Sequence, residues 1–423
     1  MVFATKMAGG GAYCGGGQKL PVLEKPLFLL RIHGTLEAIN SPSYEKDKGD
    51  MALKQEGYQY ELGPIRPPSE AYSLLIRVVR GCAWNKCKFC GFYRREKFAI
   101  RPLAHIKQDI DQIKFWVDVV RGNQTREPRN QEEYEVFYAA ASWVHYGMES
   151  VFFQDGNSIL MKPEEMLELL RYLKEVFPAI QRITTYARSD TIARLPEETL
   201  RQYAQMGLNR FHVGMETGND ELLKLVRKGV DKETQILAGK KAMAAGIEVS
   251  EFYMPGLGGK EYALQSAVDT ADVLNQVNPS VIRIRSMALA ESHELYEDYQ
   301  KGIFTRSNDM DTIREIRAFI AHLDGIDSIV ESDHILNILL ELRGKMPQDK
   351  ERMLATIDQF LNLSDEQQQL FRVGRRIGVM SAMEDLQNPM MVKRVEDIMA
   401  HYQIDTSNVD EISDQLMKGA IPL

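Results

Sequence analysis

Three of the chain's four cysteines, Cys82, Cys87 and Cys90, lie within nine residues of each other. They follow an apolar, β-like run at 74–79, so one short loop after a strand carries all three thiols. Three thiolates can hold three irons of a [4Fe–4S] cube and leave the fourth iron open for chemistry. Two alternatives stay open here. Zinc would need a fourth ligand, and the nearest following histidine, His105, lies on a predicted helix. The three cysteines could also be incidental.

Strand-like segments alternate with helix-like segments along the middle of the chain. In 103–120, for example, apolar residues recur at helical spacing. This alternation predicts an α/β fold in which a parallel sheet is covered by helices, as a partial (β/α)6 TIM-like barrel. The expected strands are 72–79, 150–154, 180–186, 210–213, 247–254 and 281–287.

Ligands of such sheets bind at the carboxyl ends of the strands. Polar or glycine-rich turns follow each expected strand, at 154–157, 186–190, 214–218, 254–259 and 285–286. Glu216 stands out, because a carboxylate between two glycines at a strand end has no evident structural purpose. Other turns have plain explanations. Gly256 and its neighbours could form a tight loop, and Asp190 could be a helix N-cap.

The cysteine loop, with an aromatic residue before its last cysteine, resembles the radical S-adenosylmethionine (SAM) superfamily, over about residues 72–290. The usual triad spacing there is three residues and then two, whereas this chain has four and then two. The stretch 214–220 resembles the fourth-strand motif of members related to methylthiotransferases and oxygen-independent coproporphyrinogen oxidase. The resemblance implies two cofactors, a [4Fe–4S] cluster on Cys82, Cys87 and Cys90 and SAM bound beside it.

The resemblance also assigns SAM contacts to single residues. It puts Glu216 at the ribose or methionyl part of SAM, and Lys228, with Arg227 as the alternate, at the carboxylate. Asp155 stands where the family usually has a glutamate that binds the SAM amino group. The predicted cofactor-binding set is Phe89, Asp155, Arg188, Glu216, Lys228 and Gly256, the last in a turn that resembles the adenine-side motif.

The implied activity is reductive cleavage of SAM to a 5′-deoxyadenosyl radical that abstracts hydrogen from an unidentified substrate, small or macromolecular. Electrons would come from a low-potential donor of the flavodoxin or ferredoxin type. No second cysteine cluster exists in the sequence, so an auxiliary cluster that donates sulfur is not expected. A different class stays open, namely an iron–sulfur and SAM-binding protein or sensor without substrate turnover.

Composition narrows the partners and the compartment. The 423 residues carry 52 Lys and Arg against 60 Asp and Glu, a net charge of −8, which does not favour a broad nucleic-acid or anionic-membrane surface. No apolar run approaches the ~20 residues that a membrane helix needs. Few cysteines, most of them clustered, indicate a reducing compartment, so we expect a cytoplasmic protein.

The chain divides into three expected parts. Residues 1–50 are glycine-rich and are expected to form a flexible, dispensable extension, with Cys14 inert and Met51 a candidate start. Residues 51–290 should form the radical SAM core barrel. Residues 291–423 should form a strand-free helical domain that covers the strand ends.

Helices of that last part are expected near 309–323, 333–344, 348–361 and 365–380. The second of them would place His334 and Asn337 on one helical face. One interpretation is an N-cap followed by an ordinary amphipathic helix. The other makes His334, or Asn337, a catalytic residue that faces the substrate.

Overall fold

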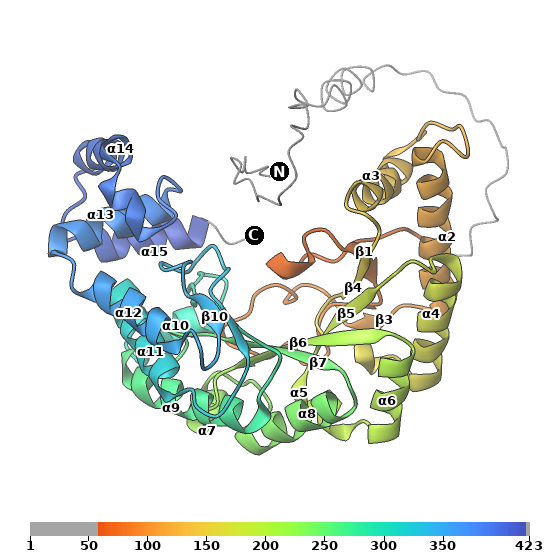
Figure 1. Ribbon diagram of the computed structural model, residues 1–423, viewed down its shortest axis with the longest axis horizontal. Coiled ribbons are helices and arrows are strands. Elements are labelled where there is room, and N and C mark those ends of the chain that lie inside the picture. The colour runs from red at the N-terminus through yellow and green to blue at the C-terminus, as the bar shows by residue number, and fades with distance from the viewer. Residues whose placement is uncertain (1–57, 420–423) are drawn as a thin grey trace, which may run out of the picture. The chain divides into compact units, whose positions relative to one another are not determined.

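The computed structural model describes residues 58–419, so Cys14, Met51 and the glycine-rich extension lie outside the described residues. Its centre is a sheet whose first six strands are all parallel and lie side by side in chain order (Figure 1). The six predicted strands are therefore confirmed. They are β1 (Leu74–Arg77), β4 (Ser150–Gln154), β5 (Arg182–Ala187), β6 (Leu208–Glu216), β7 (Glu248–Tyr253) and β8 (Val281–Ile284).

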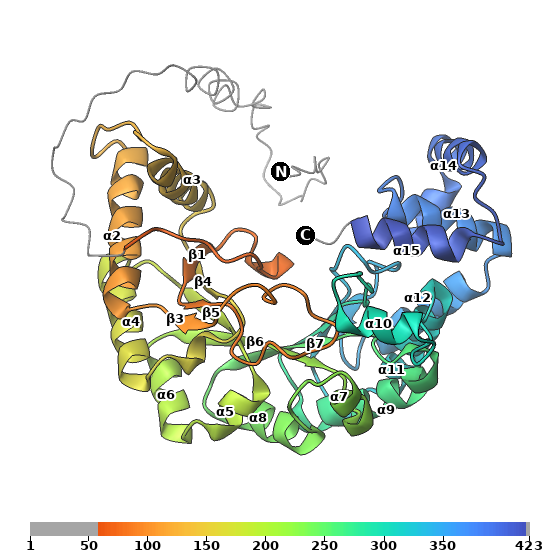
Figure 2. The same ribbon diagram turned by 180° about the vertical axis from the view of Figure 1, so that it is seen from behind.

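Helices between these strands lie along the outer side of the curved sheet (Figures 1 and 2). The helix predicted from the apolar spacing in 103–120 is confirmed, since Ile106, Ile110 and Ile113 lie on one face of it and are fully buried. The helices are α2 (Leu103–Val120), α3 (Gln131–His145), α4 (Pro163–Val176), α5 (Ser189–Arg194), α6 (Glu197–Gln205), α7 (Asp220–Leu225), α8 (Lys232–Ala244) and α9 (Gly259–Val277). Two short 3-10 helices, η2 (Pro68–Glu70) and η3 (Ser158–Leu160), precede β1 and follow β4.

The sheet does not end at β8, which corrects the expectation that residues after 290 hold no strand. β9 (Ile329–Glu331) continues the parallel sheet beside β8, and β10 (Arg343–Lys345) pairs antiparallel to β9. Each has three residues, too few for an alternating pattern to be recognised in a sequence. Because the strand order runs from β1 to β10 without closing, the sheet is an open, partial barrel.

The helix expected over 333–344 is also wrong. Asn337 donates from Nδ2 to the carbonyl oxygen of Ile284 at 2.8 Å, and its Oδ1 accepts from the Ser286 N–H at 2.8 Å. These bonds fasten an irregular turn to the end of β8 and replace helical hydrogen bonds. Asn337 is 1 % exposed and fully used, so it shares no helical face with His334.

The other helices expected in this half are present. They are α11 (Asp309–His322), α12 (Lys350–Leu361) and α13 (Asp365–Arg376). This half also contains helices that were not predicted, namely α10 (Glu294–Gln300), α14 (Pro389–His401), α15 (Val409–Gly419) and the 3-10 helix η4 (Met383–Gln387). Within residues 58–419, no helix is long and apolar enough to cross a membrane.

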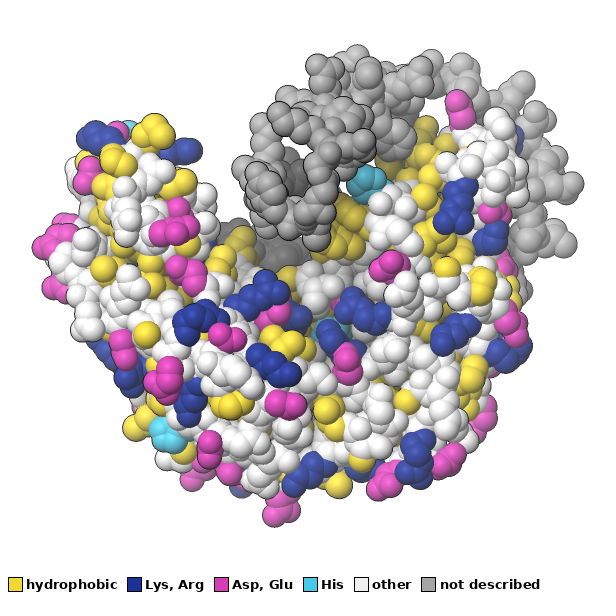
Figure 3. Space-filling view, in the orientation of Figure 1, with side chains coloured by type: hydrophobic (Ala, Val, Ile, Leu, Met, Phe, Trp, Pro, Cys, Tyr) yellow, Lys and Arg dark blue, Asp and Glu magenta, His cyan; other side chains and the backbone are white. Residues whose placement is uncertain are grey.

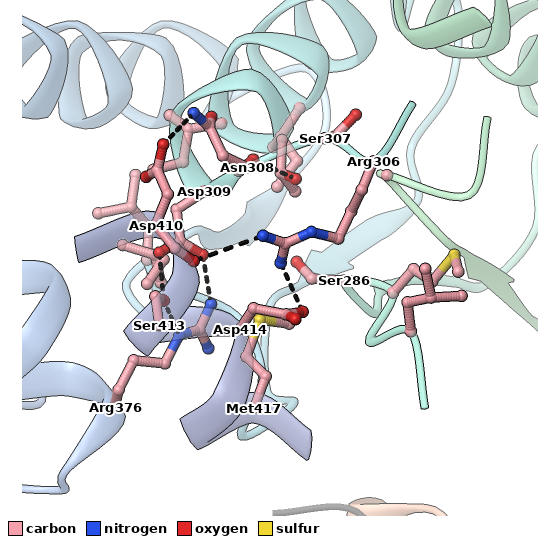
Figure 4. Close-up of a pocket in the computed structure, with 18 of the residues that line it drawn as sticks. Ser286, Arg306, Ser307, Asn308, Asp309, Arg376, Asp410, Ser413, Asp414 and Met417 are labelled. Carbon is pink, nitrogen blue, oxygen red and sulfur yellow. Dashed lines mark hydrogen bonds and ion pairs between the residues drawn. The ribbon is translucent and has the colours of Figure 1, made fainter. Parts of the chain in front are cut away.

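A buried ion-pair cluster ties α11, α13 and α15 together (Figure 4). Asp309, at the start of α11, accepts from Arg376 at 2.5 Å and from Arg372 at 3.0 Å, both on α13. The Ser413 hydroxyl on α15 donates to Asp309 at 2.6 Å, and Arg372 also pairs with Asp410. We call these five residues the Asp309 cluster. Its two arginines hold the pKa of Asp309 well below the ordinary value, against the opposing effect of burial.

Candidate active site

The three cysteines line one cavity of about 210 Å³ at the carboxyl ends of the parallel strands. We call it the cysteine cavity. The loop that carries them joins two short strands, β2 (Val79–Arg80) and β3 (Ala99–Ile100), and lies on the near side of the sheet in Figure 2. Turns after β5, β6, β7 and β8 supply the opposite wall. Cys82, Cys87 and Cys90 are all free thiols.

The cysteine loop is held from behind by Asp155. Its Oδ2 accepts from Arg77 Nε at 2.6 Å and from the Gly81 N–H at 3.2 Å, and its Oδ1 accepts from the Tyr93 hydroxyl at 3.0 Å. Arg94 then donates to three carbonyl oxygens of the loop itself. These bonds fix both ends of the cysteine segment against the end of β4.

Glu216 and Lys228 form a buried ion pair in the wall of the cysteine cavity, with Lys228 Nζ 2.9 Å from Glu216 Oε1. Glu216 has a φ of +65°, a conformation that a non-glycine residue adopts only under local strain. Burial lowers the pKa of Lys228, whereas the nearby carboxylate of Glu216 raises it. The pKa is raised overall, so the lysine stays charged. Lys228 also lies over the ring of Phe89, 5.8 Å from its centroid.

Arg188 closes one side of the same cavity. Its Nε donates to Asp190 at 2.9 Å and its Nη2 to the carbonyl oxygen of Lys228 at 3.0 Å. Its guanidinium lies 5.3 Å from the ring centroid of Trp84 in the cysteine loop. Arg188 therefore links the end of β5, the segment that follows α7 and the cysteine loop.

Residues 76–270 match the sequence model of the Radical SAM superfamily, and this range holds the cysteine loop, Glu216 and Lys228. This segment of the chain therefore matches a radical SAM domain. Members of this superfamily use SAM and a [4Fe–4S] cluster, and cleave SAM by a radical mechanism.

Curated relatives match only in part. The chain is 26 % identical over 121 residues to a tRNA uridine(34) acetyltransferase of Methanocaldococcus infernus, which is 28 % of this chain and 23 % of the relative. The same enzyme of Methanocaldococcus jannaschii is 26 % identical over 107 residues, 25 % of this chain and 20 % of the relative. The matches thus span about a quarter or less of these relatives' length.

Solved radical SAM structures are also similar. Methylornithine synthase aligns with a TM-score of 0.40 and 16 % identity, over 67 % of this chain and 68 % of that one. Coproporphyrinogen III oxidase from Escherichia coli aligns with a TM-score of 0.41 and 17 % identity, over 59 % of this chain and 52 % of that one.

Most of the predicted cofactor contacts of this radical SAM chain lie together. Phe89, Arg188, Glu216 and Lys228 all line the cysteine cavity. The alternate to Lys228 does not, because Arg227 is exposed and pairs with Glu294 on α10. The geometry therefore separates two adjacent basic residues that the sequence motif alone left interchangeable.

Two predicted contacts need correction. Asp155 is 0 % exposed, lies outside the cavity wall and already accepts the three hydrogen bonds described above, so it supports the loop and does not face a ligand. Gly256 has a φ of +86° and lines a small cavity beside the Asp309 cluster, not the cysteine cavity. Its N–H donates to Glu315 on α11 at 2.8 Å. Met254, two residues earlier, lines the cysteine cavity instead.

His334 lies in a neighbouring cavity of about 520 Å³, which we call the inner cavity. Burial, with the nearby Arg285, lowers the pKa of His334 to about 3, so its imidazole is neutral at pH 7. It follows β9 in an irregular turn and not in a helix. Its catalytic role stays a prediction.

His293 and Arg285 also line the cysteine cavity, and sequence reasoning missed them as site residues. His293 precedes α10 and packs against Gly91 in the cysteine loop, where an added Cβ would lie 3.1 Å from the Ser292 hydroxyl and 3.3 Å from the His293 ring. Burial lowers the pKa of His293 to about 4. No motif marks His293, whereas Arg285 lies in the 285–286 turn that was expected at a strand end, although no ligand contact was assigned to it.

The three cysteine thiols are arranged to suit an iron–sulfur cluster better than a single metal ion. Among the described residues, no three His, Cys, Asp or Glu side chains lie close enough to bind one metal ion. In a [4Fe–4S] cube each thiolate binds a different iron, so the thiols need to surround a volume and not to meet at a point. Three free thiols around one cavity satisfy this requirement. Burial raises the pKa of Cys90 to about 11, so its thiol needs a bound metal to lose its proton near neutral pH.

Proposed function

We propose that Cys82, Cys87 and Cys90 hold a [4Fe–4S] cluster, and that SAM binds beside it against Glu216 and Lys228. When bound, these cofactors supply a 5′-deoxyadenosyl radical that abstracts hydrogen from an unactivated C–H bond of the substrate. The observation that carries the proposal is the meeting of three free thiols and a buried Glu–Lys pair in one cavity at the strand ends.

Each charged residue of the cavity wall has a distinct part in binding. Lys228 presents a buried ammonium group, which suits the carboxylate of SAM. Glu216 presents a carboxylate, which suits the hydroxyl groups of a ribose or an ammonium group. Since the two already pair with each other, the site is held in place before a ligand arrives.

Aromatic and aliphatic side chains of the same cavity exclude water from the reaction. Phe89, Phe92, Phe252 and Met254 line it together with the charged residues. A radical formed among apolar side chains is protected from solvent, and the substrate is the nearest group left to react.

The substrate remains to be found. The tRNA-modifying relatives match over too little of their length to pass their substrate on to this chain. On the face shown in Figure 3, Lys and Arg side chains lie among Asp and Glu side chains and form no broad basic surface for nucleic acid.

Anaerobic reconstitution tests the proposal. The wild-type chain should bind about four irons and four sulfides, and should release 5′-deoxyadenosine when it is reduced in the presence of SAM. Cys82→Ala, Cys87→Ala and Cys90→Ala should each lose both properties, while Cys14→Ala should keep them. A cluster without any 5′-deoxyadenosine would indicate a binding protein or sensor, and a triad variant with full iron content would refute the cluster assignment.

A further inference from the structure

The inner cavity adjoins the cysteine cavity and is more than twice its volume, about 520 Å³ against about 210 Å³. Both cavities share wall residues inside the barrel, namely Ile65, Phe92, Tyr186, Phe252, Arg285 and Leu336. A molecule in the inner cavity would therefore lie against whatever fills the cysteine cavity. This is the place that a substrate of the proposed reaction must occupy.

Arg285 is the one charged residue among the described residues that line both cavities. Within residues 58–419, its guanidinium has no hydrogen-bond or ion-pair partner, although the side chain is half-buried. Two neighbouring cations of the cysteine cavity are paired, Arg188 with Asp190 and Lys228 with Glu216. Taking a cation partly out of water without a counter-ion costs free energy, so its position calls for an anionic ligand.

A second donor lies on the same strand face. Arg283 precedes Arg285 by two residues, so both side chains leave the end of β8 on its inner side. Arg283 is 4 % exposed and pairs through Nη1 with Glu331 and Asp333, but its Nε–H has no partner among the described residues. A buried N–H without an acceptor is rare in native structures and indicates an acceptor that the ligand brings.

Apart from the hydroxyl group of Tyr186, the rest of the shared wall is apolar. Phe92, Phe252, Ile65 and Leu336 contribute aromatic and aliphatic surface and no charge. His334, on the Arg285 side, is neutral near pH 7 and offers no counter-charge. Asp333 also lines the inner cavity, but its carboxylate is paired with Arg283. The site therefore combines the unpaired charge of Arg285 with an apolar surface.

We propose that the substrate is a small organic oxyanion, a carboxylate or a phosphate monoester on an apolar body, whose anionic group binds Arg285 and the free N–H of Arg283. Arg285 is then a specificity-determining residue. The inference rests on the proposed function only in that it calls this ligand the substrate. The alternative occupant of Arg285 is the carboxylate of SAM itself, and the experiment separates the two.

The test uses three probes that share one apolar body: phenylacetate, phenyl phosphate and the uncharged phenylacetamide. Ligand-observed NMR would measure their dissociation constants on the full chain, reconstituted and saturated with SAM but not reduced. At least one of the two anions should bind tenfold or more tightly than the amide. The tighter anion then tells a carboxylate from a phosphate.

Variants connect that preference to Arg285. Arg285→Gln should bind the preferred anion at least tenfold more weakly while its affinity for SAM changes less than threefold. Arg285→Lys should keep part of the preference, because it keeps the charge but loses the forked geometry. Arg314→Gln, on the exposed side of α11, is the control and should behave as wild type.

Equal binding of anions and amide, or unchanged anion binding in Arg285→Gln, would overturn the proposal. So would a tenfold loss of SAM affinity in Arg285→Gln, since Arg285 would then belong to the cofactor. Iron content and 5′-deoxyadenosine release of the wild-type sample are measured in parallel. Their absence would refute the proposed function while anion binding could still be judged on its own.

Discussion

Asp309 is a buried charged residue and Arg285 a half-buried one, and their surroundings differ completely. Asp309 accepts from two arginines and a serine, and none of its carboxylate oxygens is left over. Arg285 has no partner within the described residues. A satisfied charge cluster between helices holds the helices together, whereas an unsatisfied charge in a cavity weakens the fold unless a ligand completes it. The comparison thus separates residues that serve stability from residues that serve binding.

The strongest way to break this comparison is to remove Asp309. Asp309→Ala leaves Arg376 buried without its counter-ion and Arg372 with Asp410 alone, and should lower the free energy of unfolding by about 3–5 kcal/mol. Urea unfolding measures it. Asp358→Ala is the matched control, because Asp358 pairs with Arg317 on the surface, where solvent screens the pair, and its loss should change stability far less. Equal losses in the two variants would mean that the cluster does not hold the helices.

The next effect concerns binding and not stability. Glu216→Ala and Lys228→Ala should each weaken SAM binding by roughly ten- to a hundredfold, since each removes a charge-assisted contact worth about 1.5–3 kcal/mol. Calorimetry on reconstituted protein measures the affinity, and iron content should stay near four per chain. Arg227→Ala is the control, because Arg227 points to Glu294 outside the cavity. An Arg227 variant that loses as much affinity as the Lys228 variant would reverse our assignment.

The sequence was sufficient to predict the parallel strands and the position of the cysteine loop. Six strands at predicted positions and the cysteine loop after β1 follow from patterns of about five residues or more, in which apolar periodicity is distinct. The superfamily motif also placed Glu216 and Lys228 correctly in one cavity. In each case a local pattern determines a local structure.

Other features depended on contacts between distant residues, which a single sequence does not display. Asp155 was predicted at the ligand because it follows a strand, but Arg77 and Tyr93 draw its carboxylate behind the loop. The turn at 333–344 carries apolar residues at helical spacing, yet Asn337 ties it to β8. His293 lies in a loop without a motif. Tertiary hydrogen bonds decided the first two.

A third prediction uses pH to examine the Asp309 cluster. Because the pKa of Asp309 is lowered in the folded chain, its stabilising effect is complete above the ordinary carboxyl pKa near 4 and is lost as the pH falls below it. The stability advantage of the wild type over Asp309→Asn should therefore shrink by about 1 kcal/mol between pH 5 and pH 3. Urea unfolding at several pH values measures this, and a constant advantage would show that folding leaves the pKa of Asp309 unchanged.

The smallest expected effect tests how closely the Glu216–Lys228 pair must be held. A Cβ added at Gly214 would meet the carboxylate of Glu216 and the ammonium group of Lys228, both of which are ends of flexible side chains. Gly214→Ala should therefore move the two groups without unfolding the strand. We expect SAM affinity to fall by less than the tenfold lower bound for losing either partner, with the free energy of unfolding changed by about 0.5 kcal/mol or less.

Gly218→Ala, four residues later, is the matched comparison. There an added Cβ would meet the backbone carbonyl of Asp269 in α9, which cannot move without displacing the helix. This variant should lose stability, by about 1–3 kcal/mol, because an overpacked site forces a backbone shift. If Gly214→Ala also lost that much stability, the strand end at Glu216 would be as rigid as the helix contact. The strain at Glu216 would then serve the fold and not the ligand.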